Sequence, residues 1–471
     1  MKKKYKELVH NTSIFALGTF GSKILVFLIV PLYTHVLSTS EYGEIDLITA
    51  TISLLIPFAT MLIYEAAIRF LVGKESDEKT IFNNCVFVFV LGLILSIVLS
   101  PIILLLLGMI KYFLIFYILL ALSAYNTIFG QFLRASGDNW AFSLSGIMNT
   151  FFTVFLNLLF LIIFKWGING YLYALIIADI ISGVYIFIKC STAKKINLKY
   201  VNFDILKKML IFSLPLVPNN IMWWIMNAGD KYVINYFLGN SANGIFSISY
   251  KIPTIITMIF SIFMQAWQVS AIKESNDKER NAFYKDIFNF ISLILIVASL
   301  LMITFIQPLF ILIIGKDFIS AWKFVPLLSV STLINCYATF AGVVYIVNKK
   351  SFRSFFTTFV GALTNLILNF ILIRYIGLYG VAIGTLIAYL VVMIIRFIDY
   401  KESFNINLFS NKFLLLQLIV IIDAIQYTCL NNMIKYVLSF IFVIMVLFVF
   451  RNDILKIINM IFKKNISKKG R

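Results

Sequence analysis

Long apolar segments separated by short polar connections dominate the chain, and apolar residues cover every face of each segment. A bilayer crossing needs a helix of about 20 mostly apolar residues, whereas membrane β-strands alternate polar and apolar positions. The pattern therefore predicts an all-α polytopic membrane protein with about 14 transmembrane helices. These helices are predicted at residues 11–37, 46–71, 81–107, 113–132, 140–164, 168–188, 210–237, 245–272, 287–314, 322–347, 355–373, 378–398, 413–430 and 433–450.

Composition supports lipid as the main solvent of this chain. Of its 471 residues, 61% are hydrophobic and 13% are charged, whereas soluble domains carry about 25% charged residues. No soluble core can bury so much apolar surface, which excludes soluble enzymes, secreted disulfide scaffolds and nucleic-acid-binding domains. The four cysteines and two histidines are widely separated, so we predict no metal site, no cofactor and no catalytic residue.

The net charge of +19 is explained by membrane topology. With the N-terminus inside, 31 of the 40 Lys and Arg residues fall on the cytoplasmic side, six on the opposite side and three within the spans. Positive residues concentrate in cytoplasmic loops of membrane proteins. We therefore predict that both termini are cytoplasmic, that the protein spans the membrane many times and that no nucleic-acid partner is needed.

A weak internal repeat suggests two lobes of six helices each. Three residues at the exits of helices 1 and 7 recur at a constant separation of 201 positions: Leu37 and Leu238, Ser40 and Ser241, Gly43 and Gly244. A parallel repeat of this kind is a known transporter architecture, with the binding site where the repeats meet. We predict an N-terminal lobe at 1–190, a cytoplasmic linker at 191–209, a C-terminal lobe at 210–400, and two extra helices with a basic tail at 401–471. A short interfacial helix is predicted at 203–210, at the end of the linker.

The arrangement of six, six and two helices, together with local motifs, resembles the polysaccharide (O-antigen and capsule repeat-unit) flippases. These proteins belong to the multidrug/oligosaccharidyl-lipid/polysaccharide exporter superfamily. The motifs are EAAIRF at 65–70 and DKYVINYFLG at 230–239 followed by GIFSISYKI at 244–252. The resemblance implies a transporter of the bacterial inner membrane that moves undecaprenyl-pyrophosphate-linked glycan outward, with helices 1, 2, 7 and 8 lining a cationic cavity. It also implies membrane lipids as partners, and a polysaccharide polymerase and a chain-length regulator as candidate protein partners.

Three lysines within predicted spans are candidate substrate-binding residues, because an ionisable group at mid-bilayer costs about 2.5–3.5 kcal/mol. Lys23 lies about halfway along helix 1, too deep to reach water easily. Lys231 and Lys251 lie at similar depth on helices 7 and 8, next to Asp230. In one arrangement Asp230 pairs with Lys251 and leaves Lys231 to meet the lipid pyrophosphate. In the other, these charges form a structural ion pair between the two helices.

Two further sets of polar residues follow helical spacing. Trp224, Asn227 and Lys231 recur at i, i+3 and i+7, which predicts one polar-aromatic face for sugar or for packing. Glu65 and Arg69 are spaced i, i+4, which predicts an interfacial ion pair, with a substrate gate as the alternative. Asp179 and Asp423 are mid-span acids that could carry a coupling proton.

Two other functions fit a polytopic helical protein. A drug or cation exporter of the same superfamily would place lone carboxylates in the cavity, whereas lysines dominate the candidate lining here. A membrane polysaccharide polymerase or glycosyltransferase would place acidic or basic catalytic residues in a sizeable outer loop, and the predicted loops are all short. The sequence therefore favours a flippase that works by alternating access.

Overall fold

The computed structural model describes residues 29–73, 76–274, 279–348, 350–430 and 433–451, which form helices and no β-strand. The α-helices are α2 (Val30–Val36), α3 (Thr39–Thr60), α4 (Ile63–Val72), α5 (Glu78–Leu106), α6 (Phe113–Ala135), α7 (Asn139–Asn157), α8 (Gly167–Lys189), α9 (Thr192–Lys195), α10 (Phe203–Ser213), α11 (Leu216–Lys251), α12 (Thr254–Lys273), α13 (Arg280–Ile313), α14 (Val325–Ala341), α15 (Val343–Val347), α16 (Ser351–Ile376), α17 (Leu378–Phe404), α18 (Asn411–Cys429) and α19 (Ile434–Val449). Shorter turns of other helical types are η1 (Ile110–Tyr112), η2 (Leu158–Ile163), η3 (Leu198–Tyr200) and η4 (Lys316–Phe324).

The all-α membrane fold predicted from the sequence is confirmed. Twelve helical segments of the described chain are long and apolar enough to cross a bilayer, and α19 is a shorter apolar helix. Together they account for predicted helices 2 to 14. Predicted helix 1 lies mostly outside the described residues. Only its C-terminal end is described, as α2.

The predicted break between helices 7 and 8 is present in the structure. The segment α11 (Leu216–Lys251) consists of two helices that meet at Gly239, where φ is 79°. Glycine adopts a positive φ without the steric penalty of a Cβ. A second break lies within predicted helix 8, where Pro253 precedes α12 at Thr254.

Local sequence signals fix where several helices begin. Ser38 and Glu41 form a reciprocal capping box at the start of α3, so two backbone N–H groups gain side-chain acceptors. Asp77 caps α5, where its carboxylate accepts a hydrogen bond of 3.0 Å from the Thr80 amide. Hydrogen bonds from the hydroxyl and amide of Thr80 keep the pKa of Asp77 below its usual value.

By its internal contacts the described chain divides into two units. The N-terminal unit contains residues up to Tyr232 together with Gly239–Gly244, and the C-terminal unit contains Val233–Leu238 and the residues from Ile245 onward. These units group residues that pack together. The lobe boundaries expected from the repeat stay a prediction.

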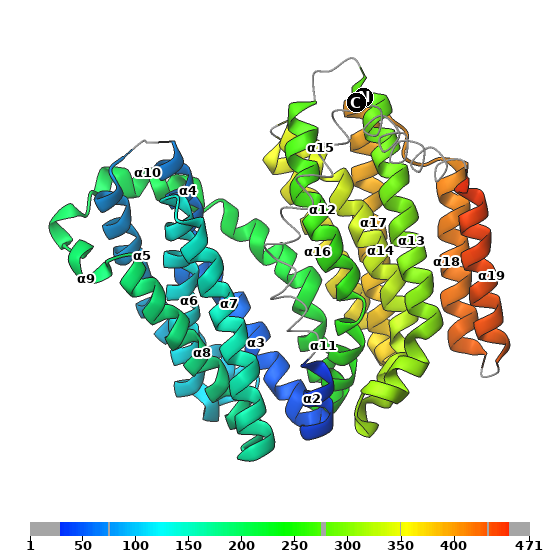
Figure 1. Cartoon of the computed structure of the whole chain (residues 1–471), viewed down its shortest axis with the longest axis horizontal. Helices are drawn as coiled ribbons and strands as arrows, with labels where there is room; N and C mark the ends of the chain where they lie inside the picture. The colour runs from blue at the N-terminus through cyan, green and yellow to red at the C-terminus, as the bar shows by residue number, and fades with distance from the viewer. Residues whose placement is uncertain (1–28, 74–75, 275–278, 349, 431–432, 452–471) are drawn as a thin grey trace, which may run out of the picture. The chain divides into compact units, whose positions relative to one another are not determined.

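In the N-terminal unit, helices α5 to α8 lie side by side around an apolar core (Figure 1). Phe82 of α5 contacts the rings of Phe129 and Phe132 on α6 at 5.3 and 5.2 Å between centroids. The predicted short linker helix is confirmed as α10, whose Leu206 and Met209 are buried. This helix packs on α4 and α5.

Two consecutive asparagines of α5 hold the linker that leads to α10. Asn83 donates a hydrogen bond to the Lys195 carbonyl and accepts one from the Asn197 amide, at 3.0 and 2.8 Å. Asn84 does the same with the backbone of Asn202, at 3.3 and 3.1 Å. The linker therefore has a defined path along α5.

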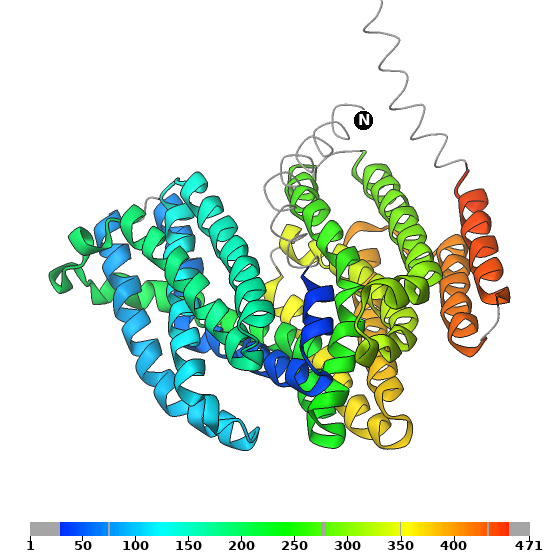
Figure 2. The ribbon, with the colours of Figure 1, turned by 60° about the horizontal axis from the view of Figure 1, so that its bottom comes forward.

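In the C-terminal unit the core is strongly aromatic. The indole of Trp267 on α12 stacks on the ring of Phe340 on α14, with 4.9 Å between centroids, and contacts Tyr284 of α13 at 5.0 Å. The last two helices, α18 and α19, lie side by side and pack against α13 (Figure 1; Figure 2). This unit therefore includes the two helices that extend beyond the predicted repeat.

Candidate functional site

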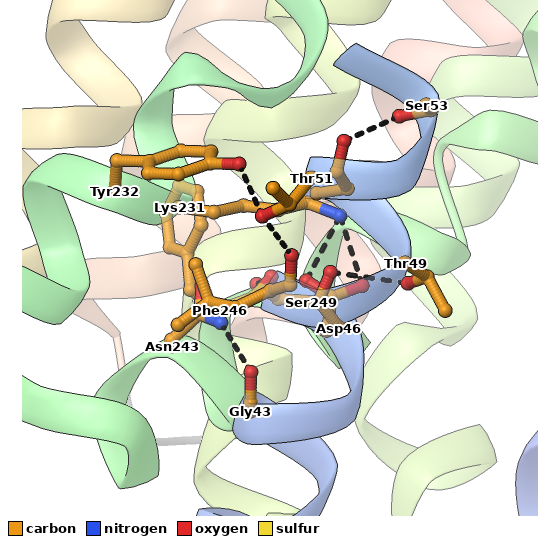
Figure 3. Close-up of polar contacts among 12 residues, drawn as sticks. Gly43, Asp46, Thr49, Thr51, Ser53, Lys231, Tyr232, Asn243, Phe246 and Ser249 are labelled. Atoms are coloured by element: carbon orange, nitrogen blue, oxygen red, sulfur yellow. Dashed lines mark hydrogen bonds and ion pairs between the residues drawn. The ribbon is translucent and has the colours of Figure 1, made fainter. Parts of the chain in front are cut away.

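The ammonium group of Lys231 on α11 binds the carboxylate of Asp46 on α3. Its Nζ lies 2.9 Å from Oδ1 and 2.9 Å from Oδ2, so the lysine contacts both oxygens (Figure 3). The Asp46 side chain is 8% exposed and the Lys231 side chain 24% exposed. This ion pair lies between two spans of the N-terminal unit, where both charges are largely removed from solvent.

Close approach of two backbones next to this pair is made possible by glycines. A Cβ on Gly43 would lie 1.9 Å from the Asn240 carbonyl oxygen, and a Cβ on Gly244 would lie 2.0 Å from that of Thr39. These two contacts are related by the same separation of 201 positions that defines the sequence repeat. The start of α3 and the turn at 239–244 thus meet in a nearly symmetric crossing.

Side-chain hydrogen bonds reinforce the same crossing. The hydroxyls of Thr39 and Ser241 lie 2.6 Å apart. Asn243 donates a 2.9 Å hydrogen bond to the Gly43 carbonyl (Figure 3). Asp46 follows Gly43 by three residues, which places it about one helical turn further along α3. The crossing therefore fixes the register that brings Asp46 to Lys231.

Aromatic residues of α11 contact α3 on the other side of the ion pair. Trp224 donates from Nε1 to the Ala50 carbonyl at 3.1 Å and to the Ser53 hydroxyl at 3.0 Å. The hydroxyl of Tyr232 lies 2.6 Å from that of Thr51, and its ring is 5.3 Å from the indole of Trp224. Polar contacts therefore join α3 to α11 along several turns.

The predicted site residues on α11 have different surroundings in the structure. Trp224 and Lys231 both contact α3, as expected if they lie on one face of α11. Asn227 is exposed, and its side chain donates to the Trp223 carbonyl at 2.7 Å. Asp230 is buried at 3% exposure in the N-terminal unit. Lys251 belongs to the C-terminal unit.

The remaining predicted site residues are Lys23, Glu65 and Arg69. Lys23 lies outside the described residues. Glu65 and Arg69 are both exposed on α4, and the Arg69 guanidinium lies 4.5 Å from the centre of the Phe212 ring on α10. The gate or ion-pair role of Glu65 and Arg69 stays a prediction, as do the binding roles of the other residues.

Asp46 is the functional candidate that the sequence analysis missed. It stands at the predicted start of helix 2, where an acidic residue is ordinary, and its partner is 185 positions away. The one available signal was its position three residues after Gly43, inside the repeated motif. Sequence reasoning considered partners for Lys231 only on neighbouring helices 7 and 8.

The acids noted within spans have neutral partners in the structure. Asp179 of α8 accepts hydrogen bonds from Ser123 at 2.9 Å, from Asn149 at 2.7 Å and from Asn126 at 3.3 Å. Asp423 of α18 accepts from Gln426 at 2.8 Å and from Ser439 of α19. Among the described residues no group of three His, Cys, Asp or Glu could hold a metal ion.

These features define a polytopic helical membrane protein with an ion pair set between two of its spans. The model of the polysaccharide biosynthesis protein family matches residues 8–268, more than half of the chain. The chain belongs to the polysaccharide biosynthesis protein family, which confirms the family expected from the sequence motifs. Comparison with curated protein sequences gives no match.

Solved structures of membrane transport proteins share this fold. The lipid II flippase MurJ in an inward closed conformation is 17% identical, with a TM-score of 0.64 over 96% of this chain and 99% of that one. A multidrug resistance MATE family transporter of the MOP superfamily is 18% identical in its inward-facing conformation, with a TM-score of 0.59 over 85% and 94% of the two chains. A multidrug resistance MATE family transporter in an outward-facing conformation is 17% identical, with a TM-score of 0.57 over 85% of this chain and 95% of that one. At these identities the similarity is one of fold.

Proposed function

We propose that this protein is a flippase that moves undecaprenyl-pyrophosphate-linked oligosaccharide repeat units across the bacterial inner membrane. The product would serve O-antigen, capsule or exopolysaccharide synthesis. Membership in a polysaccharide biosynthesis family supports the glycan pathway. The fold shared with a lipid II flippase and a multidrug transporter supports translocation rather than an enzymatic reaction.

The observation that carries this proposal is the ammonium of Lys231 within an apolar span. An ionisable residue in a membrane segment marks a substrate or ion pathway by default, since its burial is costly. Lysine binds phosphate as a point charge with three donors. Its side chain keeps 24% exposure, so the residue is not fully enclosed by protein.

Each predicted site residue has a role in the proposed mechanism. Lys23, Lys231 and Lys251 supply positive charge for the pyrophosphate, and Asp230 balances that charge. Trp224 and Asn227 offer a ring face and an amide to sugar. Glu65 and Arg69 act at the entrance as a gate or as an ion pair. The glycan stays attached to its lipid, whose tail remains in the bilayer while the site opens to each side in turn.

The proposed cellular setting follows from this substrate. The protein resides in the plasma membrane with both termini in the cytoplasm, so the glycan is loaded from the cytoplasmic leaflet. The polymerase and chain-length regulator that use the translocated units are the proposed protein partners.

The test is complementation of a strain that lacks this protein, scored by surface polysaccharide. The double variant Lys23→Ala, Lys231→Ala is expected to reach the membrane and to display little polymer. Lys316→Ala is the control, because Lys316 is exposed in η4 and has no role in the proposed mechanism. Normal polymer from a stably expressed double variant would remove these lysines from the mechanism.

Export of drugs or organic cations is the alternative. The ion pair does not decide between the two functions, because a cation could compete for Asp46 as an anion could for Lys231. The match to a polysaccharide biosynthesis family favours the flippase. Raised drug resistance on overexpression, with surface polysaccharide unchanged, would favour the exporter and contradict the flippase.

A further inference from the structure

Lys231, the proposed phosphate ligand, already holds an anion in this structure. Both oxygens of Asp46 lie 2.9 Å from Nζ. A carboxylate presents two acceptor oxygens to an ammonium, as one edge of a phosphate does. Asp46 thus occupies the donors that a pyrophosphate would use.

A pyrophosphate has the means to displace this carboxylate. It carries more negative charge and more acceptor oxygens than an aspartate, and an ammonium within a low-dielectric site favours the more highly charged partner. Displacement also has a cost, because Asp46 would be left as a buried charge, which is strongly unfavourable without new partners. Tyr42 lies four residues before Asp46, on the same face of α3, and its hydroxyl is a donor of the kind that the displaced carboxylate would need.

The position of the pair gives this exchange a mechanical consequence. The glycine crossing of Gly43 and Gly244 lies on one side of it along α3, and the hydrogen bond of Thr51 with Tyr232 lies on the other. The ion pair is thus the charged contact within a continuous attachment of α3 to α11. Loss of that contact weakens the attachment at its centre.

We propose that Asp46 is a positioning residue for Lys231, and that the pyrophosphate of the substrate displaces it and thereby loosens α3 from α11. This inference rests on the proposed function. It assigns to Asp46 two opposing effects: the carboxylate weakens substrate binding but is needed for transport. The carboxylate competes with substrate for Lys231, and its displacement links binding to movement of the two helices.

The test measures binding and transport separately in the full-length protein. The probe is farnesyl pyrophosphate, a short polyprenyl pyrophosphate, added to protein in lipid nanodiscs, with farnesol as the probe that lacks the pyrophosphate. Asp46→Asn is expected to bind farnesyl pyrophosphate about tenfold more tightly, the factor for a lysine that is occupied about nine-tenths of the time. The same variant is expected to display less surface polysaccharide, because binding no longer breaks a contact.

Three variants distinguish a positioning role of Asp46 from a purely structural role of the ion pair. Asp46→Glu keeps the carboxylate and is expected to retain near wild-type affinity and polymer. Asp46→Asn combined with Lys231→Gln is expected to show no gain in affinity, because the gain requires the lysine. Glu44→Gln is the matched control, since Glu44 is two residues away on α3 and pairs with Lys111 at 3.1 Å. It is expected to leave affinity unchanged.

A second measurement follows the contact between α3 and α11 while Asp46 and Lys231 are left unchanged. Cysteines placed by Thr39→Cys and Ser241→Cys, in a chain whose four native cysteines are changed to serine, report on the contact whose hydroxyls lie 2.6 Å apart. Farnesyl pyrophosphate is expected to slow formation of the disulfide, and farnesol is not.

The outcomes distinguish the two proposals. If the wild-type protein binds farnesyl pyrophosphate no better than farnesol, the proposed function fails and this inference falls with it. If it prefers farnesyl pyrophosphate, but Asp46→Asn binds it equally or more weakly, the inference alone is overturned. An unchanged rate of disulfide formation also overturns it, and that result holds even where Asp46→Asn does not fold.

Discussion

Lys231 and Lys435 are both lysines set in apolar helices, yet they are held by opposite kinds of partner. Lys231 of α11 binds a carboxylate and keeps 24% exposure. Lys435 of α19 is 3% exposed, donates to the side-chain oxygen of Gln307, and lies 4.8 Å from the ring centres of Trp322 and Tyr427. Its described partners are neutral, whereas the partner of Lys231 is charged.

This difference in partners indicates a structural role for Lys435 and a functional role for Lys231. Aromatic rings and an amide hold the cation in place without a counter-charge, and they come from η4, α18 and α13. Helix α19 packs on α13 and α18. A carboxylate partner can be replaced by another anion. We therefore expect Lys435 to hold the last helix in place and Lys231 to exchange partners with an anionic substrate.

The largest effect on stability is expected at the glycine crossing beside Lys231. In Gly43→Ala the new Cβ would lie 1.9 Å from a backbone oxygen of Asn240, so the backbones must separate. We expect a loss of about 3 kcal/mol, the upper end for overpacking. Thermal unfolding in nanodiscs measures it.

Gly146→Ala on α7 is the control for this substitution, because a Cβ there meets nothing within 4 Å. It is expected to stabilise slightly, as alanine does in a helix interior. Helices α18 and α19 contain no glycine, so a tight crossing distinguishes the Lys231 region from the Lys435 region. Equal stability of the two variants would contradict this distinction.

An intermediate effect is expected for Lys435→Met. Methionine keeps the apolar stem but removes the hydrogen bond to Gln307 and the cation–π contacts, at a cost of about 2 kcal/mol. The midpoint of thermal unfolding should fall, whereas Lys316→Met, at an exposed lysine, should leave it unchanged. An unchanged midpoint in Lys435→Met would show that the aromatic cage does not stabilise α19.

The smallest effect is expected for Trp224→Phe. Phenylalanine keeps the ring contact with Tyr232 but loses the two hydrogen bonds from Nε1 to α3, so unfolding should become easier by about 1 kcal/mol. Trp140→Phe is the control, because Trp140 is 73% exposed. A loss as large as that of Gly43→Ala would mean that the indole, rather than the glycine crossing, holds α3 to α11.

The fold could be predicted from the sequence because lipid imposes a simple rule on each segment. Every long apolar segment of the described chain is helical, since a span must satisfy its own backbone hydrogen bonds. The rule says less about the surroundings of charged residues near the ends of spans. Lys435 is one of the six basic residues counted on the side opposite the cytoplasm, and in the structure it is buried against aromatic rings in the first turn of α19.

Only one residue of the ion pair, Lys231, could be predicted from the sequence. The cost of burying a charge identifies Lys231 from its position in a span, whatever the rest of the chain does. Its partner depends on which helices touch, and Asp46 is 185 positions away. The repeat contained that information, because Gly43 and Gly244 correspond in sequence and meet in the structure. A weak match of three residues could not show that the two motifs are in contact.

The most direct test compares surface polysaccharide, per unit of folded protein in the membrane, for Lys231→Gln and Lys435→Gln in a strain that lacks the native protein. We predict that Lys231→Gln folds and displays little polymer, whereas Lys435→Gln is less stable but each folded molecule exports normally. Normal polymer from folded Lys231→Gln would contradict the central claim that this lysine engages the substrate.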